Sequence, residues 1–176
     1  MKGPENFNLV VTLRGQKGGT AGEELVGLEE TEMALSRYEG ELRVIESDFP
    51  NVLLFDLDMN PIEAVNIIKN SPTTVISKVV PVEAVVRTRL DSILEKVIAL
   101  VSEKVEAGET FRVICDLRGR RYIRSAGEIV EAVSEALMER FPITESDEPD
   151  WIIQIEVVGD STGVSVLRPH QVIKKE

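Results

Sequence analysis

Five arginines lie close together in one short stretch of this sequence, FRVICDLRGRRYIRS, residues 111–125. The planar guanidinium group donates two parallel hydrogen bonds, a geometry that suits phosphate. The chain of 176 residues is otherwise acidic, with a net charge of −11. The cluster therefore predicts a site for a polyanion such as RNA, although the same arginines can instead pair with glutamates. They are Arg112, Arg118, Arg120, Arg121 and Arg124.

The charge is distributed unevenly along the chain. Residues 1–75 carry six basic and thirteen acidic side chains, whereas residues 76–176 carry fourteen and eighteen. Salt screens exposed charges beyond about 8–10 Å, so a basic patch on an acidic protein acts only locally. This weighs against a high-affinity binder that ignores nucleic-acid sequence. We also expect residues 1–75 not to bind RNA by themselves.

Side chains suited to catalysis are few. The chain has one histidine, His170, and one cysteine, Cys115, so an internal disulfide and a cysteine metal cluster are excluded. Cys115 lies within an apolar strand and is expected to pack in the core. Asp56 and Asp58 share one face of a predicted strand, but two carboxylates alone are weak evidence for a metal or acid–base site. We predict no catalytic residue, no metal and no cofactor.

The first eighty residues alternate extended and helical patterns in the order of a ferredoxin-like unit. Asn60 can cap the second helix, and Pro61 suits its first position. Pro81 interrupts the last extended run. The strands are expected at 7–13, 40–47, 52–58 and within 74–86, and the helices at 22–38 and 61–71.

The later part of the chain places the arginines between a strand and a helix. An apolar stripe predicts a helix over 88–105, and strands are expected at 109–117, 151–158 and 163–167. Ser125 and Glu128 form a capping-box pattern at the start of a helix that continues to Phe141. Strand ends and a helix N-terminus therefore display the guanidinium groups at one end of a sheet.

Three segments in order resemble a THUMP domain: SKVVPVEAVVRTRLDSILEKV (77–97), TFRVICDLRGRRYIRSAGEIVEAVSEAL (110–137) and WIIQIEVVGDSTGVSVLRP (151–169). The resemblance covers roughly residues 75–173. The fold class that it implies is α/β (α+β). A ferredoxin-like domain at 1–75 would precede a THUMP domain at 76–176, with a mixed sheet packed against helices.

The resemblance also implies that the chain binds the acceptor stem and 3′ end of tRNA. We expect no DNA as a partner, and no membrane, because no apolar stretch approaches membrane-spanning length. The implied RNA-binding residues begin with the basic turn and the strand before it, and extend to the first segment and to the end of the last strand. They are Arg118, Arg120, Arg121 and Arg124, then Arg112, then Lys78, Arg87 and Arg89, and finally Arg168.

Enzymes with this domain pair carry a further catalytic domain, whereas this sequence stops at Glu176. VVPVE and the ending GVSVLRP resemble a free-standing subgroup that acts as an adaptor in tRNA cytidine N4-acetylation. The expectation is thus a cytoplasmic, non-catalytic tRNA-binding adaptor, not an enzyme, whose partner is a separate tRNA cytidine N4-acetyltransferase. The alternative is a protein–protein interaction module whose arginines dock an acidic partner without RNA.

Overall fold

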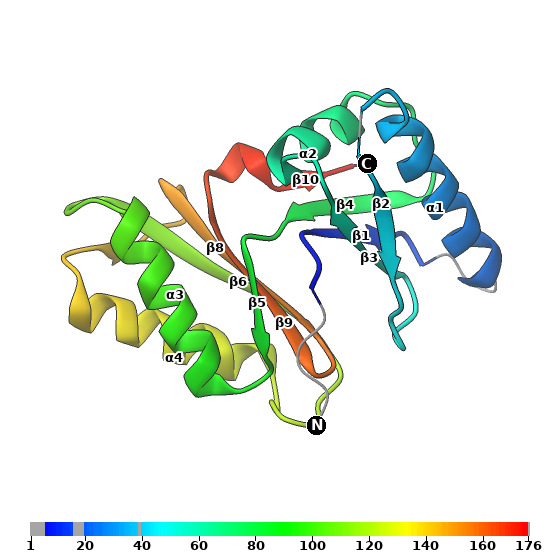
Figure 1. Ribbon diagram of the computed structural model, residues 1–176. Helices are drawn as coiled ribbons and strands as arrows, with labels where there is room; N and C mark the ends of the chain where they lie inside the picture. The colour runs from blue at the N-terminus through cyan, green and yellow to red at the C-terminus, as the bar shows by residue number, and fades with distance from the viewer. Residues whose placement is uncertain (1–5, 16–19, 39, 176) are drawn as a thin grey trace. The chain divides into compact units, whose positions relative to one another are not determined.

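A computed structural model describes residues 6–15, 20–38 and 40–175 (Figure 1). The chain divides into two compact units, a first unit of residues 6–82 with 170–176 and a second unit of residues 83–169. The division into domains at 1–75 and 76–176 stays a prediction, and the units differ from it in two strands, β4 and β10, which both lie in the first unit. None of the helices in the described residues is both long and apolar enough to cross a membrane.

The first unit is an antiparallel five-stranded sheet in the order β10-β4-β1-β3-β2, with two helices against one face. Leu9, Val11, Phe55 and Val79 point from the sheet into the same core as Ile68 of the second helix. The elements are β1 Leu9–Leu13, α1 Thr20–Leu35, β2 Leu42–Ile45, β3 Val52–Leu57, α2 Pro61–Lys69, β4 Ile76–Pro81 and β10 Ile173–Lys174.

Helix α2 begins and ends where specific side chains bind its backbone. The Asn60 side chain accepts a hydrogen bond from the Ile62 N–H at 2.8 Å, and Pro61 occupies the first turn, as the sequence predicts. At the other end, Lys175 Nζ donates to the carbonyl oxygens of Ile68 and Ser71, each at 2.7 Å. A lysine that binds free carbonyls stabilises a helix C-terminus. The chain beyond residue 169 therefore completes the first unit.

The second unit is a mixed sheet in the order β5-β9-β8-β6-β7 with two helices packed on one face. Strand β6 is parallel to β7 and β8, whereas the β8–β9 and β9–β5 pairs are antiparallel. The elements are β5 Ala84–Arg87, α3 Leu90–Lys104, β6 Thr110–Arg118, α4 Ala126–Arg140, β7 Thr144–Glu145, β8 Trp151–Val158 and β9 Ser161–Leu167; a 3₁₀ turn, Pro169–Gln171, leads on to β10. The predicted fold class is confirmed.

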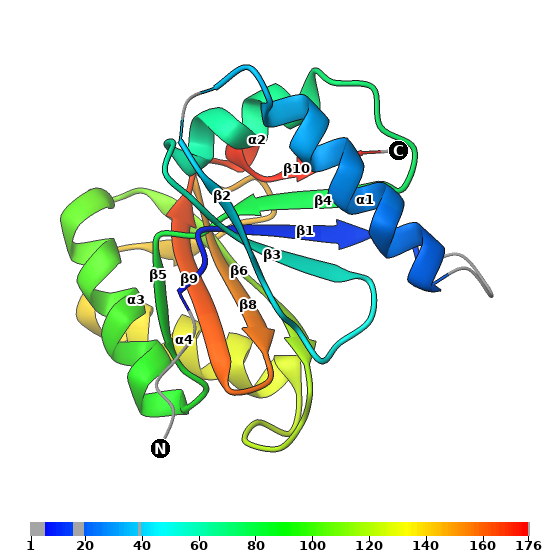
Figure 2. The ribbon, with the colours of Figure 1, turned by 45° about the vertical axis from the view of Figure 1, so that its right-hand side comes forward.

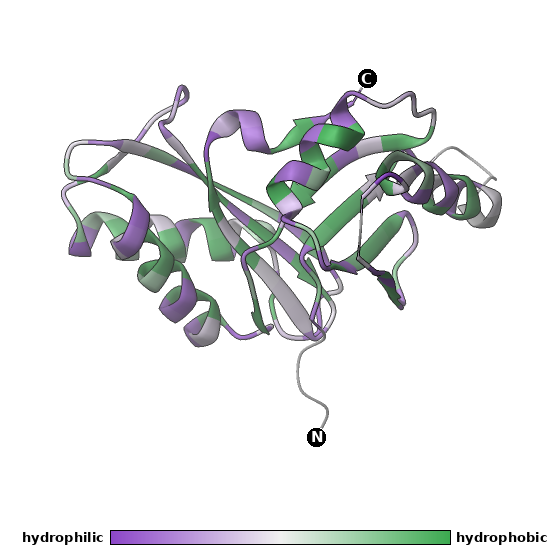
Figure 3. Ribbon diagram, turned by 45° about the horizontal axis from the view of Figure 1, so that its top comes forward, coloured by the Kyte–Doolittle hydropathy of each residue, from purple (hydrophilic) through white to green (hydrophobic). Residues whose placement is uncertain are grey.

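Alternation along β6 sets which side chains the helices cover. Phe111, Val113 and Leu117 pack with α3 and α4, and Cys115 lies against the same core. Because successive strand residues point to opposite faces, Arg112 and Arg118 lie on the other face of the sheet. Figure 3 shows the same pattern in both units, with largely hydrophobic strands and helices that carry hydrophilic and hydrophobic bands.

Candidate nucleic-acid interface

Strand register brings arginines from distant parts of the sequence to one end of the second sheet. Arg87 pairs with Ser161, Ser161 with Val158, and Val158 with Arg118, so the four residues form one row across β5, β9, β8 and β6. Three strand spacings separate the Cα atoms of Arg87 and Arg118 by roughly 14 Å. Helices α3 and α4 both begin at this end. We call it the arginine end; its arginines are Arg87, Arg89, Arg118, Arg120, Arg121 and Arg124.

The loop between β6 and α4 holds three of these guanidinium groups in solvent. Gly119 has a φ of 89°, a left-handed conformation that favours glycine and lets the chain turn directly after Arg118. Ile123 is buried and anchors the loop to the core. On either side of this anchor Arg120, Arg121 and Arg124 are exposed. The loop is therefore fixed at one point and displays its charges outward.

The start of α4 is capped by its own side chains. Ser125 Oγ accepts a hydrogen bond from the Glu128 N–H, and the Glu128 carboxylate accepts one from the Arg124 N–H, both at 3.2 Å. The predicted Ser125 cap is thus confirmed, while Glu128 binds the N–H of the residue before the cap, whereas in a standard capping box it would bind the cap's own N–H. Since these side chains occupy amide donors, the arginines and not the helix terminus supply the positive charge.

Helix α3 begins at the predicted residue Arg89 and adds a cation, Lys96, that the sequence reasoning missed. Arg89 stands at the N-cap position, makes no capping hydrogen bond through its side chain, and lies 3.6 Å from the Asp91 carboxylate. Beside it, a hollow of about 340 Å³ between β5 and α3 is lined by Arg87, Ser92 and Lys96, with Val86, Glu95 and Ala99. The spacing of residues 89, 92 and 96 places them on one side of the helix. This spacing is the signal in the sequence that could have indicated Lys96 as a further basic residue of the site.

Carboxylates also lie at the arginine end, and one of them binds Arg118. Arg118 Nη1 lies 3.2 Å from Glu156 Oε1, and only 14% of the Arg118 side chain and 1% of the Glu156 side chain are exposed. Asp160 lies in the β8–β9 turn, where its carbonyl oxygen accepts the Thr88 N–H. Arg121 lies over the Tyr122 ring at 5.4 Å. The groups most available to a ligand are therefore those of the loop.

The other three predicted site residues lie elsewhere. Arg112 belongs to the row of Ile152 and Leu167, toward the opposite end of the sheet. Arg168 follows that row; its guanidinium stacks on the Trp151 ring at 3.7 Å and donates to the Asp150 carbonyl oxygen at 3.2 Å. Lys78 lies in the first unit, on β4. The structure thus brings six of the nine predicted residues together.

The carboxylate Glu109 also contacts Arg168. It lies 3.6 Å from Arg168 Nη1 and accepts a hydrogen bond from Trp151 Nε1 at 3.0 Å. The Glu106 N–H and Trp151 hydrogen bonds lower the pKa of Glu109, so the group stays ionised. These contacts hold Arg168 against its own domain.

Asp56 and Asp58, the carboxylate pair of the sequence, bind an arginine. Arg43 Nη2 lies 3.2 Å from Asp56 and 2.9 Å from Asp58, and the Glu41 N–H donates to Asp58 at 2.8 Å. The Glu41 N–H and then Arg43 lower the pKa of Asp58, and both carboxylates raise that of Arg43. Within the described residues no three His, Cys, Asp or Glu side chains are grouped to hold a metal. The pair stabilises the β2–β3 edge.

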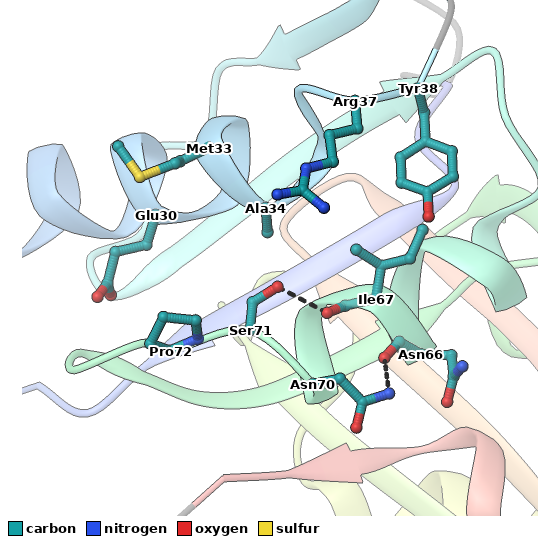
Figure 4. A pocket seen from close by; sticks show the side chains of 10 residues that line it. All are labelled: Glu30, Met33, Ala34, Arg37, Tyr38, Asn66, Ile67, Asn70, Ser71 and Pro72. Atoms are coloured by element: carbon teal, nitrogen blue, oxygen red, sulfur yellow. Dashed lines mark hydrogen bonds between the residues drawn. The ribbon is translucent and has the colours of Figure 1, made fainter.

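A larger hollow, of about 660 Å³, lies between α1 and α2 of the first unit (Figure 4). The carboxylate on its wall, Glu30, accepts hydrogen bonds from the Thr74 and Val75 N–H groups at 2.7 and 3.2 Å. Ser71 Oγ, across the hollow, donates to the Ile67 carbonyl oxygen. The carboxylate of Glu30 and the hydroxyl of Ser71 therefore both bind backbone groups.

Comparison with known proteins gives a family match within the second unit. The family model of the THUMP domain matches residues 87–167. The match includes all six residues of the arginine end and Lys96. No curated protein matches the chain.

Solved structures share the fold across both units. PH1313 from Pyrococcus horikoshii Ot3 is similar with a TM-score of 0.72 and 17% identity, over 95% of this chain and 55% of that one. A 4-thiouridine synthetase in complex with RNA and ATP gives 0.63 and 15%, over 96% and 42%. TrmN from Thermus thermophilus gives 0.58 and 18%, over 93% and 47%. The chain thus spans about half the length of these proteins.

These comparisons contradict the expectation that the protein is not an enzyme. The similar structures include a 4-thiouridine synthetase, a possible methylase from Clostridium difficile 630 and a putative methyltransferase, SMU.472. That expectation rested on the absence of a catalytic domain and of catalytic residues. In the similar enzymes the shared fold is about half of the chain or less, so its lack of catalytic groups excludes no activity.

Proposed function

We propose that this chain binds tRNA through the arginine end of its THUMP domain and presents it for chemical modification. The observation that carries the proposal is the convergence of six arginines, from β5, the start of α3, the end of β6 and the following loop, at one end of the sheet. Phosphates of a folded RNA match this array because A-form helices are recognised through shape and backbone. The RNA complex of the similar 4-thiouridine synthetase supports RNA as the ligand class.

The finer proposal concerns the part of the tRNA and the chemistry that it meets. We propose the acceptor stem and 3′ end as the bound region, with the chain acting as an adaptor for a tRNA cytidine N4-acetyltransferase. Exposed arginines supply backbone contacts, while one nearby aromatic ring, Tyr122, offers a stacking surface for an unpaired 3′ nucleotide.

Filter binding with three nucleic acids tests tRNA binding and acceptor-end recognition together: intact tRNA, the same tRNA without its 3′ end, and duplex DNA of equal length. We expect the affinity to be highest for intact tRNA and lowest for DNA. Equal affinity for all three would refute acceptor-end recognition, and no binding would favour an acidic protein partner. For the adaptor role, the acetyltransferase is assayed on tRNA with and without the chain, and an unchanged rate of cytidine acetylation would refute it.

A further inference from the structure

The last residues of the chain bring positive charge to the otherwise acidic first unit. Strand β10 pairs with β4 at the edge of the first sheet, and the Lys175 N–H donates to the Ser77 carbonyl oxygen at 2.7 Å. Figures 1 and 2 show β10 beside β4 and close to α2. Ile173 is buried in the core of the unit, so the strand is held firmly. Residues far apart in sequence thereby form one surface.

A hollow of about 390 Å³ lies at this edge. Four of the described lining residues are basic and none carries a carboxylate. The six lining residues are Lys69, His170, Val172, Ile173, Lys174 and Lys175. Lys78 lies directly opposite Lys174 in the β10–β4 register, and paired residues point to the same face of a sheet. Positive charge is therefore concentrated here, within a unit whose residues 1–75 carry an excess of seven acidic groups.

The basic groups of the hollow have different tasks. Lys175 donates to the C-terminal carbonyls of α2, and burial lowers its pKa, so it is a structural group. Lys69 in the last turn of α2, Lys174 on β10 and His170 are exposed. Across residues 6–15, 20–38 and 40–175, none of these three has a hydrogen bond or ion pair through its side chain. Two ammonium groups and an imidazole are thus available to an anion; we call these three residues the β10 patch.

We propose that the β10 patch binds a backbone phosphate of the tRNA, as a contact on the first unit in addition to the arginine end. This inference rests on the proposed function. Lysine binds phosphate as a compact point charge and needs no particular orientation, which suits a sequence-independent backbone contact. The arginine end and the β10 patch are two separate basic surfaces on one acidic protein. A phosphodiester chain, which carries many phosphates in a row, is a ligand that can contact both.

Salt-dependent binding of intact tRNA to the full chain tests the proposal. The double variant Lys69→Ala/Lys174→Ala is compared with Arg37→Ala/Arg140→Ala. The control also removes two positive charges from exposed side chains, but these lie outside both the arginine end and the β10 patch. One lost phosphate contact lowers the slope of log K against log salt by about 0.7–0.9, so between about 50 and 200 mM salt the affinity changes about threefold less than in the wild type. The control should keep the wild-type slope.

The same series includes Arg120→Ala/Arg121→Ala, which separates the two proposals. A reduced slope in the arginine variant with an unchanged slope in Lys69→Ala/Lys174→Ala overturns the β10 patch and leaves the proposed function standing. A reduced slope in the lysine variant alone supports the β10 patch and refutes the arginine end. Equal losses in the lysine variant and its control overturn the β10 patch, because they show a general effect of net charge.

A second measurement reads the lysines directly. An amine-modifying reagent is applied with and without tRNA, and the modification of Lys69 and Lys174 is quantified by mass spectrometry. We expect tRNA to protect both amines from modification. Protection by inorganic polyphosphate but not by tRNA would overturn the proposal.

Discussion

Replacing Arg120 and Arg121 with alanine tests the arginine end most directly. Both side chains are exposed on a loop whose anchor, Ile123, is untouched by the change. If each guanidinium neutralises one phosphate, the double variant releases two fewer counterions on binding. The slope of log K against log salt should then fall by about 1.4–1.8. The variant should lose affinity for different tRNAs by similar factors, because backbone contacts carry no sequence information.

The size of the effect follows from that slope. Between about 50 and about 200 mM salt, a slope difference of about 1.4–1.8 changes the ratio of wild-type to variant affinity about 7- to 12-fold. The loss should be largest at low salt. Stability should change by about 1 kcal/mol or less, since exposed arginines contribute little and the contact of Arg121 with the Tyr122 ring, at 5.4 Å, is solvent-exposed.

Filter binding over a salt series measures the slope, and thermal unfolding confirms that the variant is folded. Arg37→Ala/Arg140→Ala again serves as the control of equal charge. An unchanged slope in the folded Arg120→Ala/Arg121→Ala variant would refute the reasoning, because it would mean that these arginines do not contact phosphate.

Three further predictions concern single residues. Ser125→Ala removes the cap of α4 and should lower the free energy of unfolding by about 1 kcal/mol in urea denaturation; no loss would show that the hydrogen bond at 3.2 Å contributes nothing. Cys115→Ala should cost about 1–2 kcal/mol by leaving a cavity, with tRNA affinity within about twofold, and a large loss of binding in a folded variant would assign the thiol a functional role. Asp58→Asn should lower stability at neutral pH. Because Asp58 has a lowered pKa in the folded state, its contribution is present above the unfolded value of about 3.9 and is lost as the pH falls through the folded one, so urea melts of the two proteins should converge in acid.

Local signals in the sequence predicted the elements well. Asn60 with Pro61, and Ser125 with Glu128, cap helices in the structure as their spacing indicates, because capping involves residues only two to four positions apart. The apolar stripe over 88–105 likewise corresponds to α3. Such contacts need no knowledge of the rest of the chain.

Contacts between distant residues could not be predicted in this way. The extended run 74–86, interrupted by Pro81, is expected to supply one strand to the first domain, yet it supplies β4 to the first sheet and β5 to the second. The pairing of Arg118 with Glu156 spans 38 residues and depends on the β6–β8 register. Strand β10 has two residues, too few for a periodic pattern. The sequence therefore named all six arginines of the arginine end together with three residues that lie elsewhere, and it missed Lys96.

The return of the chain to its first sheet has a consequence for the order of folding. Ile173 meets Val79 across almost a hundred residues, and between them lies the whole second unit. During synthesis, residues 83–169 are all made before the strand that completes the first sheet. Until then the β4 edge lacks its neighbour, and an unpaired edge strand can recruit another chain. Because Ala84 pairs with Val164 in the second sheet, a folded second unit brings the chain that follows β4 next to the chain that leads to β10, and so it shortens the loop that β10 must close. We therefore expect the second unit to fold first and the first unit to be completed last.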